Sequence, residues 1–258
     1  MTSTLAFICI AVSVLITSFI SGILGMAGGM ILMGVLLALL SLPAAMMLHG
    51  ITQMASNGWR AWLWRTNVNW GVFRGYAGGA LLAVGFFVLV QFVVGKATAY
   101  ILLGLTPFIS FVLPKRLTLN VDSRGHPFVC GIVCTAMQLL AGVSGPLLDV
   151  FFVRSSMSRH GVVATKAMSQ TLGHLIKILY FGGISALTVT GNTMPEGLSL
   201  TLIVACVALA FTGTTFSTRV LSKMSDANFR NWTQWTVLTM GVIYLASGGW
   251  MLASFGNA

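Results

Sequence analysis

Charged residues are scarce in this sequence, and acidic residues are the scarcest of them. Asp, Glu, Lys and Arg make up 7% of the 258 residues, and the acidic ones number four. A soluble domain carries about 25% charged residues, so this chain cannot cover itself with a water-facing surface. The composition therefore excludes soluble enzymes and soluble binding modules.

Cysteine is also sparse, and its positions indicate packing rather than chemistry. Cys130 and Cys134 are four residues apart and share one face of a helix, while no His or acidic residue stands at metal-ligand spacing. Cys9 and Cys206 lie in other apolar stretches. Buried free cysteines behave as small apolar side chains, so we expect no disulfide, no metal and no cofactor.

What the sequence has in abundance is long apolar runs. Hydrophobic residues make up 57% of the chain, and runs of about 20 of them, the length that crosses a bilayer, recur from end to end. The first six residues contain no Lys or Arg, so the first run is expected to be a native span rather than a signal peptide. We predict an all-α polytopic membrane protein in which residues 1–258 form a single transmembrane domain.

The basic residues fit a membrane protein better than a nucleic-acid-binding one. There are 14 of them, which gives a net charge of +10. Cytoplasmic loops of membrane proteins are rich in Lys and Arg, and nothing in the sequence resembles a nucleic-acid-binding module. We expect the lipid bilayer, and no nucleic acid, as a partner.

Polar and glycine-bearing breaks divide the chain into two series of spans. An apolar stretch over 5–42 is interrupted at 25–29, and spans follow at 46–65, 72–94 and 98–113. After a polar segment at 114–126, an apolar stretch over 127–153 is interrupted at 142–146. Spans then follow at 162–182, 198–217 and 231–253.

The two series have the same order, which predicts an internal repeat. At a constant offset of 117 residues, Gly25 matches Gly142, Gly28 matches Gly145, Ser41 matches Ser158 and Gln53 matches Gln170. We therefore assign 1–113 to a first repeat, 114–126 to a cytoplasmic linker and 127–258 to a second repeat.

The basic residues also orient the repeats. Four groups of basic residues can all lie on the cytoplasmic side, and both termini then lie on the external side. The groups are Arg60, Arg65 and Arg74; Lys115, Arg116 and Arg124; Arg154 and Arg159; and Arg219, Lys223 and Arg230. Each broken stretch must then begin and end on one side. The stretch 127–153 is too short for two crossings and predicts a re-entrant hairpin, whereas 5–42 is long enough for two complete spans. The second repeat is inverted relative to the first, an architecture of secondary transporters.

The span after each broken stretch has one polar face. In the first repeat that face carries His49, Gln53, Asn57 and Arg60, and the aligned residues of the second are Lys166, Gln170, His174 and Lys177. Spacings of three and four place each set on one stripe of a helix. For Arg60 and Lys177 the alternative is snorkelling to the interface, and for the glutamines it is a hydrogen bond between helices. We favour a polar pocket in which Gln53 and Gln170 act together with Asn57, Lys166 and His174, with Lys166 supplying positive charge.

The glycine-rich breaks are the expected second wall of that pocket. Free backbone N–H groups and the positive end of a helix dipole suit an anion; the alternative is that small residues merely allow close helix packing. The candidate residues are Gly25, Ala27, Gly28, Gly29, Ser144 and Gly145.

Three residues are candidates for coupling transport to protons. Asp149 is the one acid in an apolar stretch, where a lone carboxylate is expensive, so we expect it to pair with Lys166 or Arg154. His49 and His174 are the other candidates because imidazole titrates near neutral pH.

The two glycine-broken segments, Gly25 to Gly29 and Gly142 to Pro146, each followed by a span with a central Gln, resemble the TauE/SafE family of sulfite and organosulfonate exporters. The resemblance covers nearly the whole chain. It implies a multi-pass permease of the bacterial inner membrane that moves small anions such as sulfite or sulfonates, and it leaves a homodimer open. The sequence departs from the family near Met33, where members typically have a proline after a denser glycine run.

Two other functions fit part of the pattern. A passive anion channel would use the same pocket. The segment from Gly142 to Gly145 also matches the G-x-S-G of rhomboid intramembrane proteases, with Ser144 as nucleophile and His174 as its partner. Ala27 occupies the position equivalent to Ser144 in the first repeat, so the glycine break of the repeat explains that motif better, and we expect no enzyme.

Overall fold

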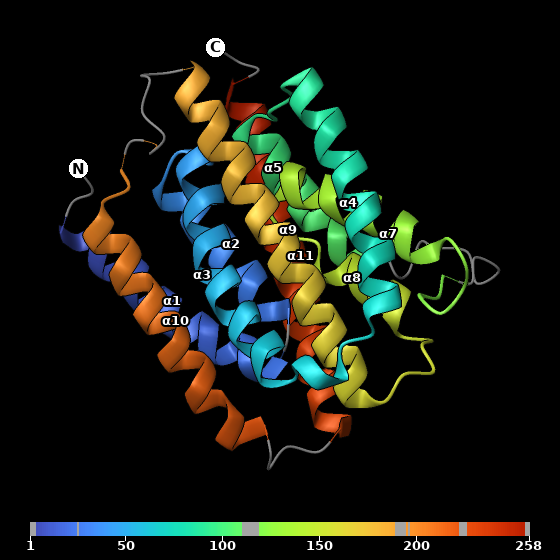
Figure 1. Ribbon diagram of the computed structural model, residues 1–258. Coiled ribbons are helices and arrows are strands. Elements are labelled where there is room, and N and C mark those ends of the chain that lie inside the picture. The colour runs from blue at the N-terminus through green and yellow to red at the C-terminus, as the bar shows by residue number, and fades with distance from the viewer. Residues whose placement is uncertain are drawn as a thin grey trace.

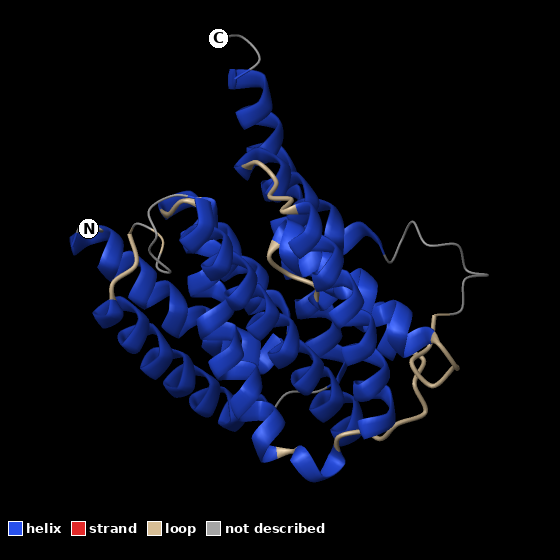
Figure 2. Ribbon diagram, turned by 45° about the horizontal axis from the view of Figure 1, so that its top comes forward, coloured by secondary structure: helices blue, strands red, loops and turns tan. Residues whose placement is uncertain are grey.

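The computed structural model describes residues 4–24, 26–109, 119–188, 195, 197–221 and 226–255, and all regular structure within these residues is helical (Figures 1 and 2). The prediction of an all-α protein is confirmed. Within the described part of the chain, four helices are long and apolar enough to cross a membrane, at Thr4–Ile23, Trp70–Val90, Leu200–Ser217 and Gln234–Ser254. Many of their large apolar side chains are exposed, as expected for surfaces that face lipid.

Both glycine-bearing stretches are broken helices. The first consists of α1 (Thr4–Leu24) and α2 (Met26–Leu39). Because α2 has 14 residues, its length is about 21 Å, short of the roughly 30 Å of a bilayer core. The first stretch therefore contains one long and one short helix rather than two full-length spans. Gly25 lies outside the described residues.

The second broken stretch consists of α7 (His126–Ala141) and α8 (Gly145–Phe152). Gly142 ends α7 with a φ of +79°, a left-handed conformation that favours glycine. Pro146 stands in the first turn of α8, where its missing N–H is not needed. These two residues explain why the helix stops and restarts within five positions.

The helix after each break is long and polar on one side. These helices are α3 (Leu42–Leu63) and α9 (Arg159–Thr188), and they pack against each other. Their first residues are 117 positions apart, the offset of the predicted repeat. The polar stripe keeps both out of the set of strongly apolar spans. Helix α9 extends beyond the predicted 162–182.

Two further helices complete each half of the chain. In the first half they are α4 (Trp70–Val90) and α5 (Lys96–Leu105), and Pro107 in the short 3₁₀ segment η2 (Thr106–Phe108) ends the regular α-helix. The predicted span 98–113 is described as far as residue 109. In the second half they are α10 (Leu200–Leu221) and α11 (Asp226–Phe255).

Helix packing is reciprocal between the halves. Helix α1 packs on α10 and α4 packs on α7, on opposite flanks of the molecule (Figure 1), while α3 pairs with α9 and α5 with α11. Glycines allow the close approaches. A Cβ at Gly79 of α4 would overlap the Phe128 carbonyl, and one at Gly131 of α7 would overlap the Tyr76 carbonyl. Exchanging the two halves leaves this pattern of pairs unchanged.

Several of the basic loops lie together at one end of the molecule. The short segment η1 (Arg65–Asn67) contacts the start of α9, and the ring of Trp64 stacks on that of His160 with centroids 4.5 Å apart. The loop before α7 is tied to the loop after α8 by Asp122, which accepts hydrogen bonds from Ser155 and Ser156. Both ends of the described chain lie toward the opposite end (Figure 1). Lys115, Arg116 and Lys223 are outside the described residues.

Candidate functional site

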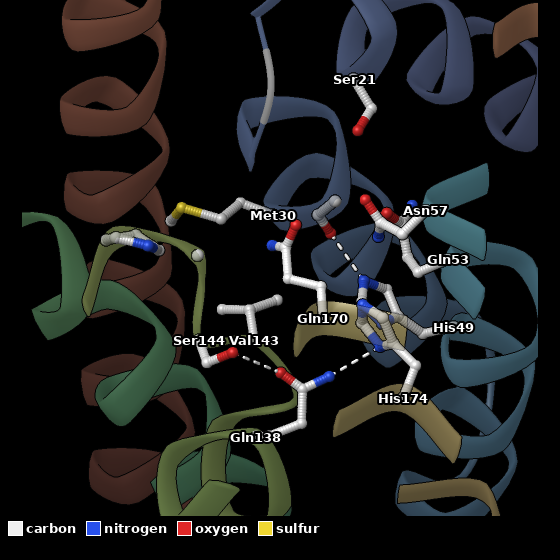
Figure 3. A pocket seen from close by; sticks show the side chains of 13 residues that line it. Ser21, Met30, His49, Gln53, Asn57, Gln138, Val143, Ser144, Gln170 and His174 are labelled. Carbon is white, nitrogen blue, oxygen red and sulfur yellow. Dashed lines mark hydrogen bonds between the residues drawn. The ribbon is translucent and has the colours of Figure 1, made fainter. Parts of the chain in front are cut away.

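A small pocket lies where the two broken helices meet the polar faces of α3 and α9 (Figure 3). In the figure Gln53, Asn57 and His49 lie on one side of it and Ser144 and Gln138 on the other. The residues that line it are Ser21, Gly29, Met30, His49, Gln53, Asn57, Gln138, Val143, Ser144, Gly145, Pro146, Gln170 and His174. Six elements from both halves of the chain therefore contribute to one site.

The first turns of the two short helices supply part of the lining. Gly29 belongs to the first turn of α2, and Gly145 is the first residue of α8. The first N–H groups of a helix have no partner within it, and the helix dipole makes this end positive. Two such ends at one pocket favour a negatively charged ligand.

Not every glycine of the first break serves the pocket. A Cβ at Gly28 would overlap the Thr17 carbonyl, so this glycine allows α1 and α2 to pack closely and lies outside the lining. Ala27 is buried and also lies outside it. Gly29 is the one described residue of the predicted first-break set that lines the pocket.

Gln53 has an unused hydrogen-bond donor. Its side chain is 3% exposed, and its Nε2 has no hydrogen-bond partner. A buried donor without a partner costs about 1–3 kcal/mol. Because Gln53 lines the pocket, a ligand with an acceptor oxygen would satisfy this group.

His49 joins both broken helices to the pocket. Its Nε2 lies 2.9 Å from the Gly29 carbonyl oxygen, and Nζ of Lys177 lies 2.7 Å from its Nδ1. Lys177 also donates to the Gly142 carbonyl at 2.8 Å. Since the ammonium group has no acceptor, Nδ1 of His49 accepts and Nε2 carries the proton. Lys177, fully buried, thus connects the break of α7 to α3 of the other half.

His174 belongs to a second chain of hydrogen bonds. The Ser144 hydroxyl donates to Oε1 of Gln138 at 2.9 Å, and Nε2 of Gln138 lies 2.6 Å from Nδ1 of His174 (Figure 3). Because the amide oxygen accepts from Ser144, the amide nitrogen faces His174 and donates to it. The proton of His174 therefore sits on Nε2. Ser144, Gln138 and His174 all line the pocket.

Lys166 and Asp149 form an ion pair beside the site rather than within its lining. Nζ of Lys166 contacts Oδ1 of Asp149, which confirms the expectation that Asp149 pairs with a nearby cation. Neither residue lines the pocket. Lys166, which sequence reasoning placed on the same polar face, is therefore not among the lining residues, whereas Gln170, one turn further along α9, is.

Arg60 and Lys177, aligned by the repeat, have equivalent contacts. Arg60 donates to the Ser21 carbonyl near the end of α1 at 3.3 Å and lies 3.5 Å from Oδ1 of Asn57. Lys177 donates to the Gly142 carbonyl at the end of α7. Each cation thus lies at the negative end of a helix dipole. In this structure both cations donate a hydrogen bond to a carbonyl near a helix break, and neither lines the pocket.

Sequence reasoning missed Ser21, Met30, Gln138, Val143 and Pro146. A signal for one pair was present, because Gln138 lies 117 residues after Ser21. Gln138 is also a large polar residue within the apolar run that becomes α7. The offset would have found both residues if it had been extended backwards from the glycines.

The pocket has the chemistry of a site for an anion. None of its lining residues, all of which the structure describes, is Asp or Glu. It offers side-chain amides, a serine hydroxyl, imidazole and helix N-termini. A helical protein with lipid-facing apolar surfaces that encloses such polar groups between two broken helices has the features of the class of membrane transport proteins.

Comparison with protein families agrees with this class. The model of the sulfite exporter TauE/SafE family matches residues 9–244, and the chain belongs to this family. Searches of curated proteins and of solved structures found no significant match. The TauE/SafE family is one of transporters and not of enzymes. In agreement, Ser144 donates to Gln138 rather than to His174, unlike the pair expected of a rhomboid protease.

Proposed function

We propose that this protein is a secondary transporter that moves small sulfur-containing anions, such as sulfite or organosulfonates, through the pocket between α3 and α9. The observation that carries the proposal is that Nε2 of Gln53 is buried and has no hydrogen-bond partner. Gln53 lines a pocket that is also lined by the first turns of α2 and α8. A buried donor and two helix N-termini together favour an oxyanion.

Each part of the pocket has a defined role in the proposal. Gln53 and Gln170, equivalent in the repeat, donate directed hydrogen bonds from α3 and α9. The first turns of α2 and α8, at Gly29 and Gly145, supply backbone N–H groups and positive potential. Asn57 lies beside Gln53 in Figure 3 and extends the polar wall.

Transport would proceed by alternating access between two inverted repeats. The reciprocal packing of α1 on α10 and α4 on α7 supports this proposal, as do the equivalent carbonyl contacts of Arg60 and Lys177. Related halves that meet at a central site can rock around it and open it to each side in turn. The halves would be 1–113 and 127–258, with a linker at 114–126.

The proposed setting is the bacterial inner membrane, with the basic loops in the cytoplasm. Cysteine labelling tests the orientation. In a variant without the four native cysteines, a single cysteine at Arg65 or Arg124 should react with a membrane-impermeant maleimide only in inverted vesicles. A cysteine at Gly95, in the loop between α4 and α5, should react only in right-side-out vesicles. Labelling of all three from one side would contradict the orientation.

Flux in proteoliposomes tests the function. We expect saturable uptake of labelled sulfite and sulfoacetate that responds to a pH gradient, and little uptake of chloride or taurine. The Gln53→Ala and Gln170→Ala variants should each raise KM. Non-saturable flux that ignores the pH gradient would indicate a passive channel, and no flux with folded protein would contradict the proposal. Unchanged flux in both variants would place the site elsewhere.

A further inference from the structure

The Ser144–Gln138–His174 chain has a definite direction, and that direction can be reversed. In the present state Ser144 donates to Gln138, and Gln138 donates to Nδ1 of His174. The Ser144 hydroxyl proton is therefore directed at Gln138. Only a lone pair of the Ser144 oxygen, which can accept but not donate a hydrogen bond, remains available to a ligand in the pocket. In this state Ser144 offers an anion no donor.

Protonation of His174 is incompatible with this direction. A second proton on the ring would sit on Nδ1, and an imidazolium has two donors and no acceptor. The Gln138 amide would then have to rotate, so that Oε1 accepts from Nδ1 and Nε2 faces Ser144. The serine hydroxyl can accept this bond because it is both a donor and an acceptor. Its own proton would then be released from Gln138 and could turn toward the pocket.

We propose that Gln138 is a positioning residue that transmits the protonation of His174 to Ser144, so that the Ser144 hydroxyl donates to a bound anion only when His174 is charged. This inference rests on the proposed function, since it specifies how that anion site is linked to a proton. Of the three proton-coupling candidates, His49, Asp149 and His174, it assigns the proton to Nδ1 of His174. It also gives a role to Gln138, which sequence reasoning did not select.

His49 lacks an equivalent route. Its Nδ1 accepts from Lys177 and its Nε2 donates to the Gly29 carbonyl, so a second proton would place two cations at one hydrogen bond. Nε2 of His174 makes no such hydrogen bond among the described contacts, and the His174 ring centroid lies 5.6 Å from that of His49. The two histidines are neighbours with different partners.

The surroundings of His174 link its charge to the anion. Titratable and charged groups on α9 and on the elements packed against it include His49 and Arg60 on α3, Arg74 and Tyr76 on α4, His126, Cys130 and Cys134 on α7, Asp149 on α8, Arg65 on η1, and Lys166 and Lys177 on α9 itself. Asp149 is already paired with Lys166, and Lys177 is a cation one turn away. A charge on His174 therefore needs a counter-charge, which an anion in the pocket would provide. Proton and anion should bind cooperatively, and each should strengthen the other.

The first test needs no ligand. The chain has four histidines, and a His174→Gln variant assigns the His174 signals in ¹⁵N-histidine NMR of the purified protein. We expect neutral His174 to carry its proton on Nε2 in the wild type, and to lose this preference in Gln138→Met. A proton on Nδ1 in the neutral wild type would overturn the relay, whatever the protein transports.

The second test measures anion binding against pH. Methanesulfonate is a suitable probe because its charge is constant over about pH 5 to 8, the range in which histidine changes charge. We expect wild-type affinity to rise as pH falls, by a factor within the roughly 5- to 150-fold typical of coupled sites. Gln138→Met and Ser144→Ala remove the hydrogen-bonded relay but keep the charge of His174, so their affinity for methanesulfonate should depend on pH clearly less than that of the wild type. Thr171→Val, whose hydroxyl donates within α9, should keep the wild-type dependence.

The outcomes separate the two proposals. If Gln138→Met and Ser144→Ala keep the wild-type pH dependence while His174→Gln loses it, the proton acts without the relay and the inference is wrong, but the anion site stands. If the folded wild type binds neither methanesulfonate nor sulfite at any pH, the proposed function is wrong.

Discussion

The ammonium group of Lys177 lies 2.7 Å from Nδ1 of His49, and the two residues come from different halves of the chain. The same lysine holds the Gly142 carbonyl at the end of α7, and His49 holds the Gly29 carbonyl in α2. One buried pair thus connects both helix breaks and the two central helices. Any rocking of the halves would have to rearrange this connection.

Replacing His49 should destabilise the folded protein. His49→Leu keeps a side chain of similar volume, removes the imidazole contact to the Gly29 carbonyl and leaves one Lys177 donor without a partner. A buried donor without a partner costs about 1–3 kcal/mol, so the melting temperature in detergent should fall by several degrees. His160→Leu is the control, because His160 is exposed and contacts Trp64 by stacking. An equal loss in both variants would contradict the role given to the buried pair.

The contact between α4 and α7 should be sensitive to a single methyl group. Gly131→Ala places a Cβ on the Tyr76 carbonyl, and backbone cannot yield as a flexible side chain does. We expect a loss of at least the 1–3 kcal/mol typical of overpacking, measured as a lower melting temperature. Gly85→Ala on α4 is the control, since a Cβ there meets nothing within 4 Å. Alanine favours a helix by about 1 kcal/mol over glycine, so Gly85→Ala should not destabilise the protein.

The helical class and most span positions could be predicted because hydrophobicity and length determine which segments enter a bilayer. The starts of α3 and α9 also lie 117 residues apart, which is the offset of the predicted repeat. The hydrogen-bond partners could not be predicted. Lys166 and Lys177 look alike in sequence, yet one is paired with Asp149 and the other with His49. The two lysines have different partners because α8 places its one acidic residue, Asp149, beside Lys166.

The glycine breaks illustrate the same limit. Their sequence predicted interruptions, and the structure has them. The sequence did not distinguish Gly28, which lies against α1, from Gly29, which lies at the pocket. Successive residues of a helix point about 100° apart, so the face of each glycine is fixed only once α2 is packed.

The loops at the basic end should loosen in acid. Hydrogen bonds from the Ser156 backbone and from Ser156 and Ser155 hydroxyls hold the pKa of Asp122 below its ordinary value. The stabilising contact is therefore complete above the ordinary aspartate pKa of about 3.9 and is lost as pH falls through the lower folded-state value. In Asp122→Asn the Ser156 amide, 2.6 Å from Oδ2 in the wild type, should exchange with deuterium faster at neutral pH. Unchanged exchange would show that another contact holds this loop.

Gln53 should show opposite effects on stability and transport. Gln53→Leu removes a buried amide whose Nε2 has no partner, so the folded protein should keep or gain stability. The same change removes a donor to the proposed anion, and a hydrogen bond to a charged group contributes about 1.5–3 kcal/mol, which corresponds to a KM higher by about 10- to 150-fold. Thr52→Val on the same helix is the control, because the Thr52 hydroxyl donates to the Leu48 carbonyl within α3 and does not line the pocket. Melting and sulfite uptake measured on the same preparations would separate the two effects. A side chain that binds the ligand should be required for transport but not for the stability of the fold. If the Gln53→Leu protein instead has a lower melting temperature and transports sulfite normally, the Gln53 amide contributes to packing and not to anion binding.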